Sequence, residues 1–280
     1  MTSPRGTGPA LDAPRIAQMQ RRVLTWFAAH RRDLPWRRTV DPYAVLVSEV
    51  MLQQTQVARV VPRFEDWLDA FPTLEALAAA SLVDVLGHWQ GLGYNTRARR
   101  LRDAAGAAVE ATRPGCAAEL PRSPAGLQAL PGIGPYTARA VLIFAHNDDL
   151  AAVDANVRRV LTHELALPID LPPRELQAIA HAALPPGRSR DWHNALMDYG
   201  AMVLTARATG IAPRTRQSTF EGSRRQYRAR LLRLLLQRGP LSIDELAGAL
   251  SLEPAVAREL VRLLASDGLV VFRDERVAVA

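Results

Sequence analysis

The chain has 280 residues, 48% of them hydrophobic and 22% charged, which is the composition of a globular protein with a sizeable core. Its net charge of +7 favours a polyanionic partner, nucleic acid first, although an arginine-rich genome would give the same balance. All 35 Lys and Arg residues are arginine, so no side-chain amine can form a Schiff base. No segment has the length of a membrane span or the apolar core of a signal peptide. We therefore expect a cytoplasmic protein.

Metal-binding residues are scarce. Cys116 is the only cysteine, which excludes a disulfide within the chain and any cysteine cluster for zinc or iron–sulfur. The six histidines lie far apart in the sequence. We expect no metal site.

The first two-thirds of the chain predict helices and no strand. Residues 1–14 are expected to be a disordered leader, and apolar residues then recur at helical spacing from Ile16 to His30. Asp41-Pro42 predicts the start of a helix that carries VLVSEVMLQQT. Further helices are predicted at 57–70, after Thr73, from Ser81, and through 94–112.

The last third predicts a linker and a small module. Residues 207–223 lose apolar periodicity and are rich in Thr, Ser, Gly and Pro, which is typical of a linker. Residues 224–280 predict three helices, the second with a Ser242/Glu245 capping box, followed by a hairpin of LVVF and RVAVA. This order is typical of a winged-helix module.

The segment LPGIGPYTARAVL, residues 130–142, is the strongest local motif. Gly132 and Gly134 allow a tight turn with close backbone approach, and Pro135 suits the first turn of the next helix. Backbone N–H groups at such a helix start attract an anion. The segment therefore predicts a helix-hairpin-helix that holds a DNA phosphate without reading sequence.

Two carboxylates are candidates for catalysis. Glu49 has mostly apolar neighbours three and four positions away on its predicted helix, so it is either a buried partner of an arginine or a carboxyl with a raised pKa that can donate a proton. Asp154 caps the helix that begins at Ala155, where the helix dipole favours its ionised form. A protonated Glu and an ionised Asp are the pair that cleaves a glycosidic bond through an oxocarbenium-like state.

Five motifs stand in the order and spacing of one family: SEVMLQQTQV (48–57), WQGLGYNTRARRL (89–101), LPGIGPYTARAVL (130–142), VDANVRRVL (153–161) and HNALMDYGAMV (193–203). Over about residues 20–205 the chain resembles helix-hairpin-helix (HhH-GPD) DNA glycosylases of the MutY type, which remove adenine. The resemblance implies an all-helical fold of two lobes that extrudes the target nucleotide from double-stranded DNA.

The resemblance also implies catalytic roles. Glu49 matches the proton donor to adenine, and Asp154 matches the carboxylate that stabilises or captures the sugar cation. Tyr136 and Asn156 match residues that assist this pair. Tyr136 also stands where bifunctional relatives of the endonuclease III type carry a catalytic lysine. A monofunctional enzyme that leaves an abasic site is therefore expected.

Further positions match DNA contacts of the family. Gln54 resembles the wedge that fills the stack beside the flipped base, and Tyr94 resembles a second stacking residue. Trp36 and Arg37 match a segment that lines the base pocket. Each of these residues, taken alone, would be explained as well by packing or solvation.

Three departures from the family pattern are visible. The family usually has four cysteines after the stretch matching Gly200-Ala201-Met202, where this chain reads VLTARATGIAPR, so its iron–sulfur cluster is expected to be absent. Where long forms carry a MutT-like domain that recognises 8-oxoguanine, residues 224–280 are expected to form only a short winged-helix-like module. Asn95 stands where a second tyrosine is frequent.

The predicted organisation is a glycosylase core at 15–206, with a six-helix lobe at about 36–145 and a second lobe from 15–35 and 146–206. The predicted function is removal of adenine opposite 8-oxoguanine or guanine by a bacterial, nucleoid-associated monomer without a cofactor. The alternatives are a thymine or uracil glycosylase acting opposite guanine, and a non-catalytic DNA-binding protein. The motif MLQQTQV favours the adenine enzyme, and anchoring alone would need none of the four catalytic matches.

Overall fold

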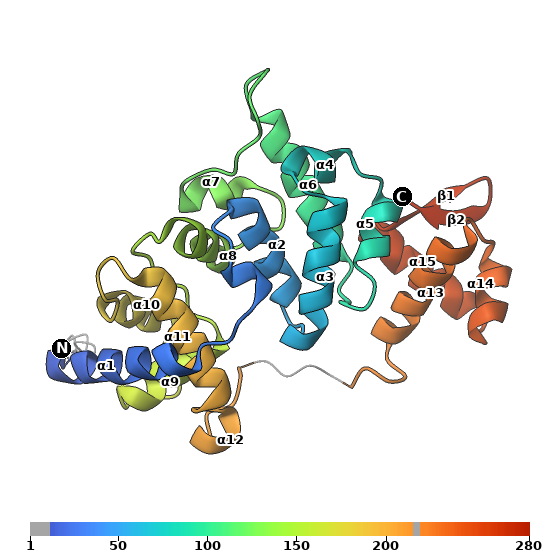
Figure 1. Ribbon diagram of the computed structural model, residues 1–280. Coiled ribbons are helices and arrows are strands. Elements are labelled where there is room, and N and C mark those ends of the chain that lie inside the picture. Colours follow the sequence, from blue (N-terminus) through green and yellow to red (C-terminus); the bar gives the residue numbers. More distant parts are fainter. Residues whose placement is uncertain (1–11, 215–218) are drawn as a thin grey trace, which may run out of the picture. The chain divides into compact units, whose positions relative to one another are not determined.

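The computed structural model describes residues 12–214 and 219–280, and it is mostly helical, with 63% helix and two short strands (Figure 1). The predicted all-helical class with a small C-terminal strand module is confirmed. The predicted leader at 1–14 lies mainly outside the described residues, and the first helix begins at Ala13 with Asp12 as its cap. None of the described helices combines the length and apolarity that crossing a bilayer requires.

Contacts divide the chain into two compact units, Met1–Val45 with Gly134–Arg216 and Leu46–Ile133 with Gln217–Ala280. The first unit contains α1 (Ala13–His30), η1 (Pro35–Arg37), the start of α2 (Pro42–Leu52), α8 (Pro135–Val141), the π-helix η2 (Leu142–His146), α9 (Ala155–Glu164), α10 (Pro173–Ala182), α11 (Ser189–Met202) and α12 (Ala206–Thr209).

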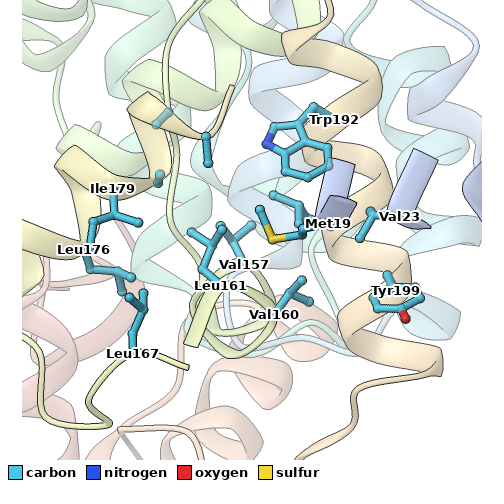
Figure 2. Packing of buried hydrophobic residues seen from close by; sticks show 14 of the residues in the cluster. Met19, Val23, Val157, Val160, Leu161, Leu167, Leu176, Ile179, Trp192 and Tyr199 are labelled. Carbon is cyan, nitrogen blue, oxygen red and sulfur yellow. The ribbon is translucent and has the colours of Figure 1, made fainter. Parts of the chain in front are cut away.

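The core of the first unit lies among α1, α9, α10 and α11. Figure 2 shows Met19 and Val23 of α1 close to Val157 of α9 and Trp192 of α11. All four side chains are at most 1% exposed, which is what apolar residues at helical spacing achieve when helices pack face to face. The core therefore fixes α9, which begins directly after Asp154.

The second unit contains the end of α2, α3 (Val57–Ala70), α4 (Leu74–Ala79), α5 (Leu82–His88), α6 (Thr96–Glu110) and α7 (Pro124–Ala129). Trp67 lies edge-on to Trp89 and to Phe71, with ring centroids 5.4 and 4.9 Å apart. The predicted helix starts are confirmed, because Thr73 and Ser81 accept hydrogen bonds from the first turns of α4 and α5. Helix α6 starts at Thr96 and not at the predicted residue 94, because Tyr94 has a positive φ of 48°.

The C-terminal module follows in the second unit as α13 (Arg224–Arg238), α14 (Ile243–Leu250), α15 (Pro254–Ser266) and the antiparallel strands β1 (Val270–Arg273) and β2 (Arg276–Val279). The predicted three helices and hairpin are confirmed, and so is the Ser242/Glu245 capping box. The contacts of this module group it with residues 46–133, and its separate domain status stays a prediction.

Candidate active site and DNA-contacting turns

Asp154 lies at the N-terminus of α9 in the first unit. Its Oδ1 accepts a hydrogen bond from Val157 N at 2.7 Å, which confirms the predicted cap, and its Oδ2 accepts from Asn156 Nδ2 at 3.0 Å. Burial raises the pKa of Asp154 above the ordinary value of 3.8, and these hydrogen bonds offset the effect only in part. The prediction from sequence considered only the helix dipole. The structure therefore gives a carboxylate that is costly to ionise but well provided with donors.

Asn156 connects Asp154 to a buried arginine. Its Oδ1 accepts from Arg159 Nη2 at 2.6 Å, while its Nδ2 donates to Asp154. The same Arg159 donates to the carbonyls of Gly200 at 2.6 Å and Leu204 at 2.5 Å. Because both ends of the Asn156 amide are engaged, the amide holds Oδ2 of Asp154 in one orientation.

His193 holds the segment that leads into Asp154. Its Nε2 accepts from Ala152 N at 3.0 Å, and its Nδ1 lies 2.8 Å from the carbonyl of Ser189. These partners require a neutral ring with the proton on Nδ1, and burial lowers the pKa of His193 accordingly. Sequence reasoning treated this histidine as ordinary, although it lies in the motif HNALMDYGAMV.

Gly200 permits the close approach of α11 to α9. A Cβ at this position would lie 2.9 Å from Asn156 Cβ and 3.1 Å from the Asn156 carbonyl. We expect Gly200→Ala to cost about 1 to 3 kcal/mol of stability by overpacking and to slow base excision by displacing Asn156. Thermal unfolding and a single-turnover assay measure both effects.

Gly106→Ala is the matched control, because Gly106 lies inside α6 and nothing lies within 4 Å of its added Cβ. That change is expected to stabilise the protein by about 0.5 to 1 kcal/mol. Equal stability of the two variants would contradict the close-approach argument.

Glu49 lies near the end of α2 in the second unit and is 8% exposed. Its helix neighbour Leu46 is fully buried, and Ser48 and Val50 beside it are 2% and 6% exposed. The predicted burial of this carboxyl is thus confirmed.

Gln54 and Tyr94 occupy two turns of the second unit with an unusual backbone. Their φ angles are 55° and 48°, in the left-handed region that non-glycine residues seldom adopt. Gln54 follows α2 and is exposed, and Tyr94 precedes α6 and is half-buried. Such outliers cluster at functional sites, where surrounding contacts hold the strained turn.

Arg97 supplies those contacts for both turns. Its Nη1 donates to the carbonyls of Val50 at 2.6 Å and Gln53 at 2.8 Å. Its Nη2 donates to the carbonyl of Gly93 at 2.9 Å, directly before Tyr94. Burial lowers the pKa of Arg97 to about 10, so the guanidinium remains charged at neutral pH. One side chain therefore fixes the end of the Glu49 helix and the Tyr94 turn together.

The turn between α7 and α8 has the predicted hairpin geometry. Gly132 has a φ of 77°, and a Cβ there would lie 2.7 Å from Arg100 Cβ, so only glycine fits. Gly134 is the residue before α8, and Pro135 opens that helix. Gly132 is exposed, so the backbone of the turn is accessible to a ligand.

Arg37 forms a buried ion pair. Its two Nη atoms lie 2.7 and 2.9 Å from the oxygens of Asp198, which also accept from Arg32. Burial alone would raise the pKa of Asp198, but the hydrogen bonds and charges of Arg37 and Arg32 outweigh burial and lower it. Trp36, on the same 3₁₀ turn, is 9% exposed. Both residues are fixed within the first unit, and a role in binding a base stays a prediction.

Comparison with known proteins identifies the family. The model of the HhH-GPD superfamily base excision DNA repair proteins matches residues 47–186. An adenine DNA glycosylase of Mycolicibacterium smegmatis is 39% identical over 89% of this chain and 91% of its own. The chain belongs to the HhH-GPD superfamily. The predicted resemblance to MutY-type enzymes is confirmed by such relatives.

Further comparisons give one more adenine DNA glycosylase and two solved structures of similar fold. The human adenine DNA glycosylase is 40% identical over 69% of this chain and 37% of its own. A thermostable thymine-DNA glycosylase has a TM-score of 0.64 and 27% identity over 70% of this chain and 90% of its own. A trapped complex of endonuclease III with DNA shares the fold, with a TM-score of 0.62 at 20% identity over 73% of this chain and 92% of the other.

Residues 203–214, where the resemblance implies four cysteines, contain no cysteine, and Cys116 is exposed elsewhere, so this segment offers no thiolate ligands for an iron–sulfur cluster. Arginine side chains connect this segment to other parts of the first unit. Arg159 donates to the carbonyl of Leu204 and Arg158 to that of Ala212, each at 2.5 Å, and Arg214 donates to the carbonyl of Leu171 at 2.7 Å. Thr205 caps the short helix α12 within the segment.

Proposed function

We propose that this protein is a monofunctional adenine DNA glycosylase that removes adenine mispaired with 8-oxoguanine or guanine and leaves an abasic site. The observation that carries the proposal is the match to an adenine DNA glycosylase over nearly the full length of both chains. The motif residues Glu49, Asp154, Tyr136 and Asn156 all remain in this chain. The partner is double-stranded DNA, bound by a monomer.

The proposed reaction is hydrolysis of the bond between the base and C1′ of its sugar. The buried Glu49 carboxyl gives its proton to the departing adenine, so that the base leaves as a neutral molecule. The ionised Asp154 stabilises the positive charge that develops on the sugar. Water then bonds to C1′ and gives a proton to the Glu49 carboxylate, which completes the abasic product and restores the acid.

In the proposed complex, DNA is bound by the turns at Gln54, Tyr94 and Gly132. The turn at Gly132 and Gly134 binds a backbone phosphate, and Gln54 and Tyr94 fill the stack beside the extruded nucleotide. Their strained backbone supports this role, because Arg97 holds the backbone of both turns through the carbonyls of Gln53 and Gly93.

The proposed enzyme does not cut the DNA strand and needs no cofactor. Tyr136 stands at the position of the catalytic lysine in bifunctional relatives, and the chain contains no lysine. No cluster of cysteine ligands is available either, and arginines bind the segment at 203–214.

A single-turnover assay on duplexes that carry A opposite 8-oxoguanine, A opposite G, T opposite G and U opposite G tests the proposal. We expect cleavage at adenine, and only after alkali is added, because alkali breaks the abasic site. Release of thymine or uracil but not adenine would contradict the proposal. Strand cleavage without alkali, or a complex trapped by borohydride, would contradict monofunctionality.

A thymine or uracil mismatch glycosylase is the second candidate. The likeness to a thymine-DNA glycosylase at 27% identity favours it. The duplexes with T or U opposite G decide between the two candidates directly.

A further inference from the structure

Tyr94 is held from the C-terminal module as well as from its own lobe. Arg225, in the first turn of α13, donates from Nη1 to Tyr94 Oη at 2.5 Å. Its Cζ also lies 5.4 Å from the centroid of the Tyr94 ring, within the range of a cation–π contact. The residue that contacts the aromatic ring thus comes from a segment 131 positions later in the chain.

The position of Arg225 is itself fixed by its surroundings. The Arg225 Cζ lies 5.3 Å from the ring of Phe220, and Ser223 caps α13 by accepting from Gln226 N. Arg225 is half-buried, whereas Arg233 on the same helix is exposed. The guanidinium of Arg225 is therefore held against Tyr94 by its surroundings, unlike the charge of an exposed arginine.

Other contacts join the module to this lobe near the same turn. The Arg99 side chain lies against Gly268, where an added Cβ would be 3.3 Å from Arg99 Nε. Arg99 is in α6, two residues after Arg97, and Arg97 Cζ lies 5.7 Å from the Tyr94 ring. The Tyr94 turn is thus bounded by α6 of the lobe and α13 of the module.

We propose that Arg225 is a positioning residue that holds the Tyr94 ring ready to stack in DNA, so that the C-terminal module takes part in DNA recognition. This inference rests on the proposed function, which assigns Tyr94 to the base stack. A ring whose hydroxyl and face are both engaged loses less conformational freedom when it inserts between bases. The module would then act through Tyr94, without reading bases itself.

The test is a double-mutant cycle of Arg225→Met and Tyr94→Ala in the Glu49→Gln background, which separates binding from base removal. We expect Arg225→Met to weaken binding of a duplex with A opposite 8-oxoguanine by about tenfold, the scale of one stacked aromatic ring. In the Tyr94→Ala background the same change should have little effect, because the ring it positions is gone. Tyr94→Phe, which removes only the hydroxyl, should give part of the loss and preserve the fold.

Arg233→Met is the matched control, because it removes the same charge from an exposed position of α13. It should weaken binding far less. A 2-aminopurine beside the base opposite the target reports stacking, and at saturating protein Arg225→Met should reduce its fluorescence change. Equal losses of DNA affinity for Arg225→Met and Arg233→Met would overturn the proposal. So would a double variant whose loss of affinity equals the product of the losses of Arg225→Met and Tyr94→Ala, because the two residues would then act independently.

These outcomes are separate from those for the proposed function. If the wild-type protein releases no base from any duplex, the assignment as a glycosylase fails. The cycle still reports whether Arg225 and Tyr94 are coupled in binding DNA. If excision occurs but the cycle shows no coupling, only the role of Arg225 is wrong.

Discussion

Glu49→Gln is expected to slow removal of adenine by about 100- to 10,000-fold, the range that general acid catalysis contributes. Glutamine has nearly the same shape as glutamate, so packing in α2 should be retained around a side chain that is only 8% exposed. The amide cannot release a proton to the leaving base. Single-turnover rates on a duplex with A opposite 8-oxoguanine measure the loss.

Glu65→Gln is the matched control for this change. Glu65 lies in α3 and is exposed. Its change to glutamine replaces a carboxyl by an amide, as Glu49→Gln does. Its rate should equal that of wild type, and both variants should bind DNA like wild type. A full excision rate for Glu49→Gln would mean that Glu49 is not the proton donor.

Local features of the fold could be predicted from the sequence because their causes are local. Asp41, Thr73 and Ser81 each accept hydrogen bonds from backbone N–H groups two or three residues ahead. Such caps depend on a few adjacent residues, and so does the Ser242/Glu245 capping box. The candidate catalytic residues were found differently, through motifs in register with a family.

The arginines show what sequence could not supply. The net charge, which the arginines supply, indicated a polyanionic partner. Arg97, Arg158 and Arg159, however, donate to backbone carbonyls within the protein. The carbonyls that Arg97 binds at Val50 and Gln53 lie 47 and 44 positions away. Hydrophobic periodicity carries no information about such long-range pairs, so part of the positive charge that suggested DNA binding is used to build the site instead.

The same limit applies to Asp154. Its cap could be predicted from the letters VDANV, but its burial depends on residues distant in the sequence. Burial proved to be the larger influence on its pKa. The helix dipole alone would have given the opposite direction.

Asp154→Asn is expected to slow base excision by about 100- to 1,000-fold, the loss typical of removing one charge-stabilising group. Asparagine is as good an N-cap as aspartate, so the bond from Val157 N should survive. In the proposed mechanism the active form of Asp154 is the ionised one. Because the pKa of Asp154 lies above 3.8, the excision rate should fall on acidification at a higher pH than for an ordinary aspartate.

The difference in stability between the wild-type protein and Asp154→Asn should depend on pH. A carboxyl whose pKa is raised by folding stabilises the native state in its protonated form. That stabilisation is complete below the unfolded value, about 3.8, and is lost as the pH rises through the folded value. Asp154→Asn cannot titrate, so the free energy of unfolding of wild type relative to Asp154→Asn should decline over this window and stay constant above it. Paired unfolding curves across the window measure the difference, and a relative stability that rises with pH would show that the cap and the dipole outweigh burial at this carboxylate.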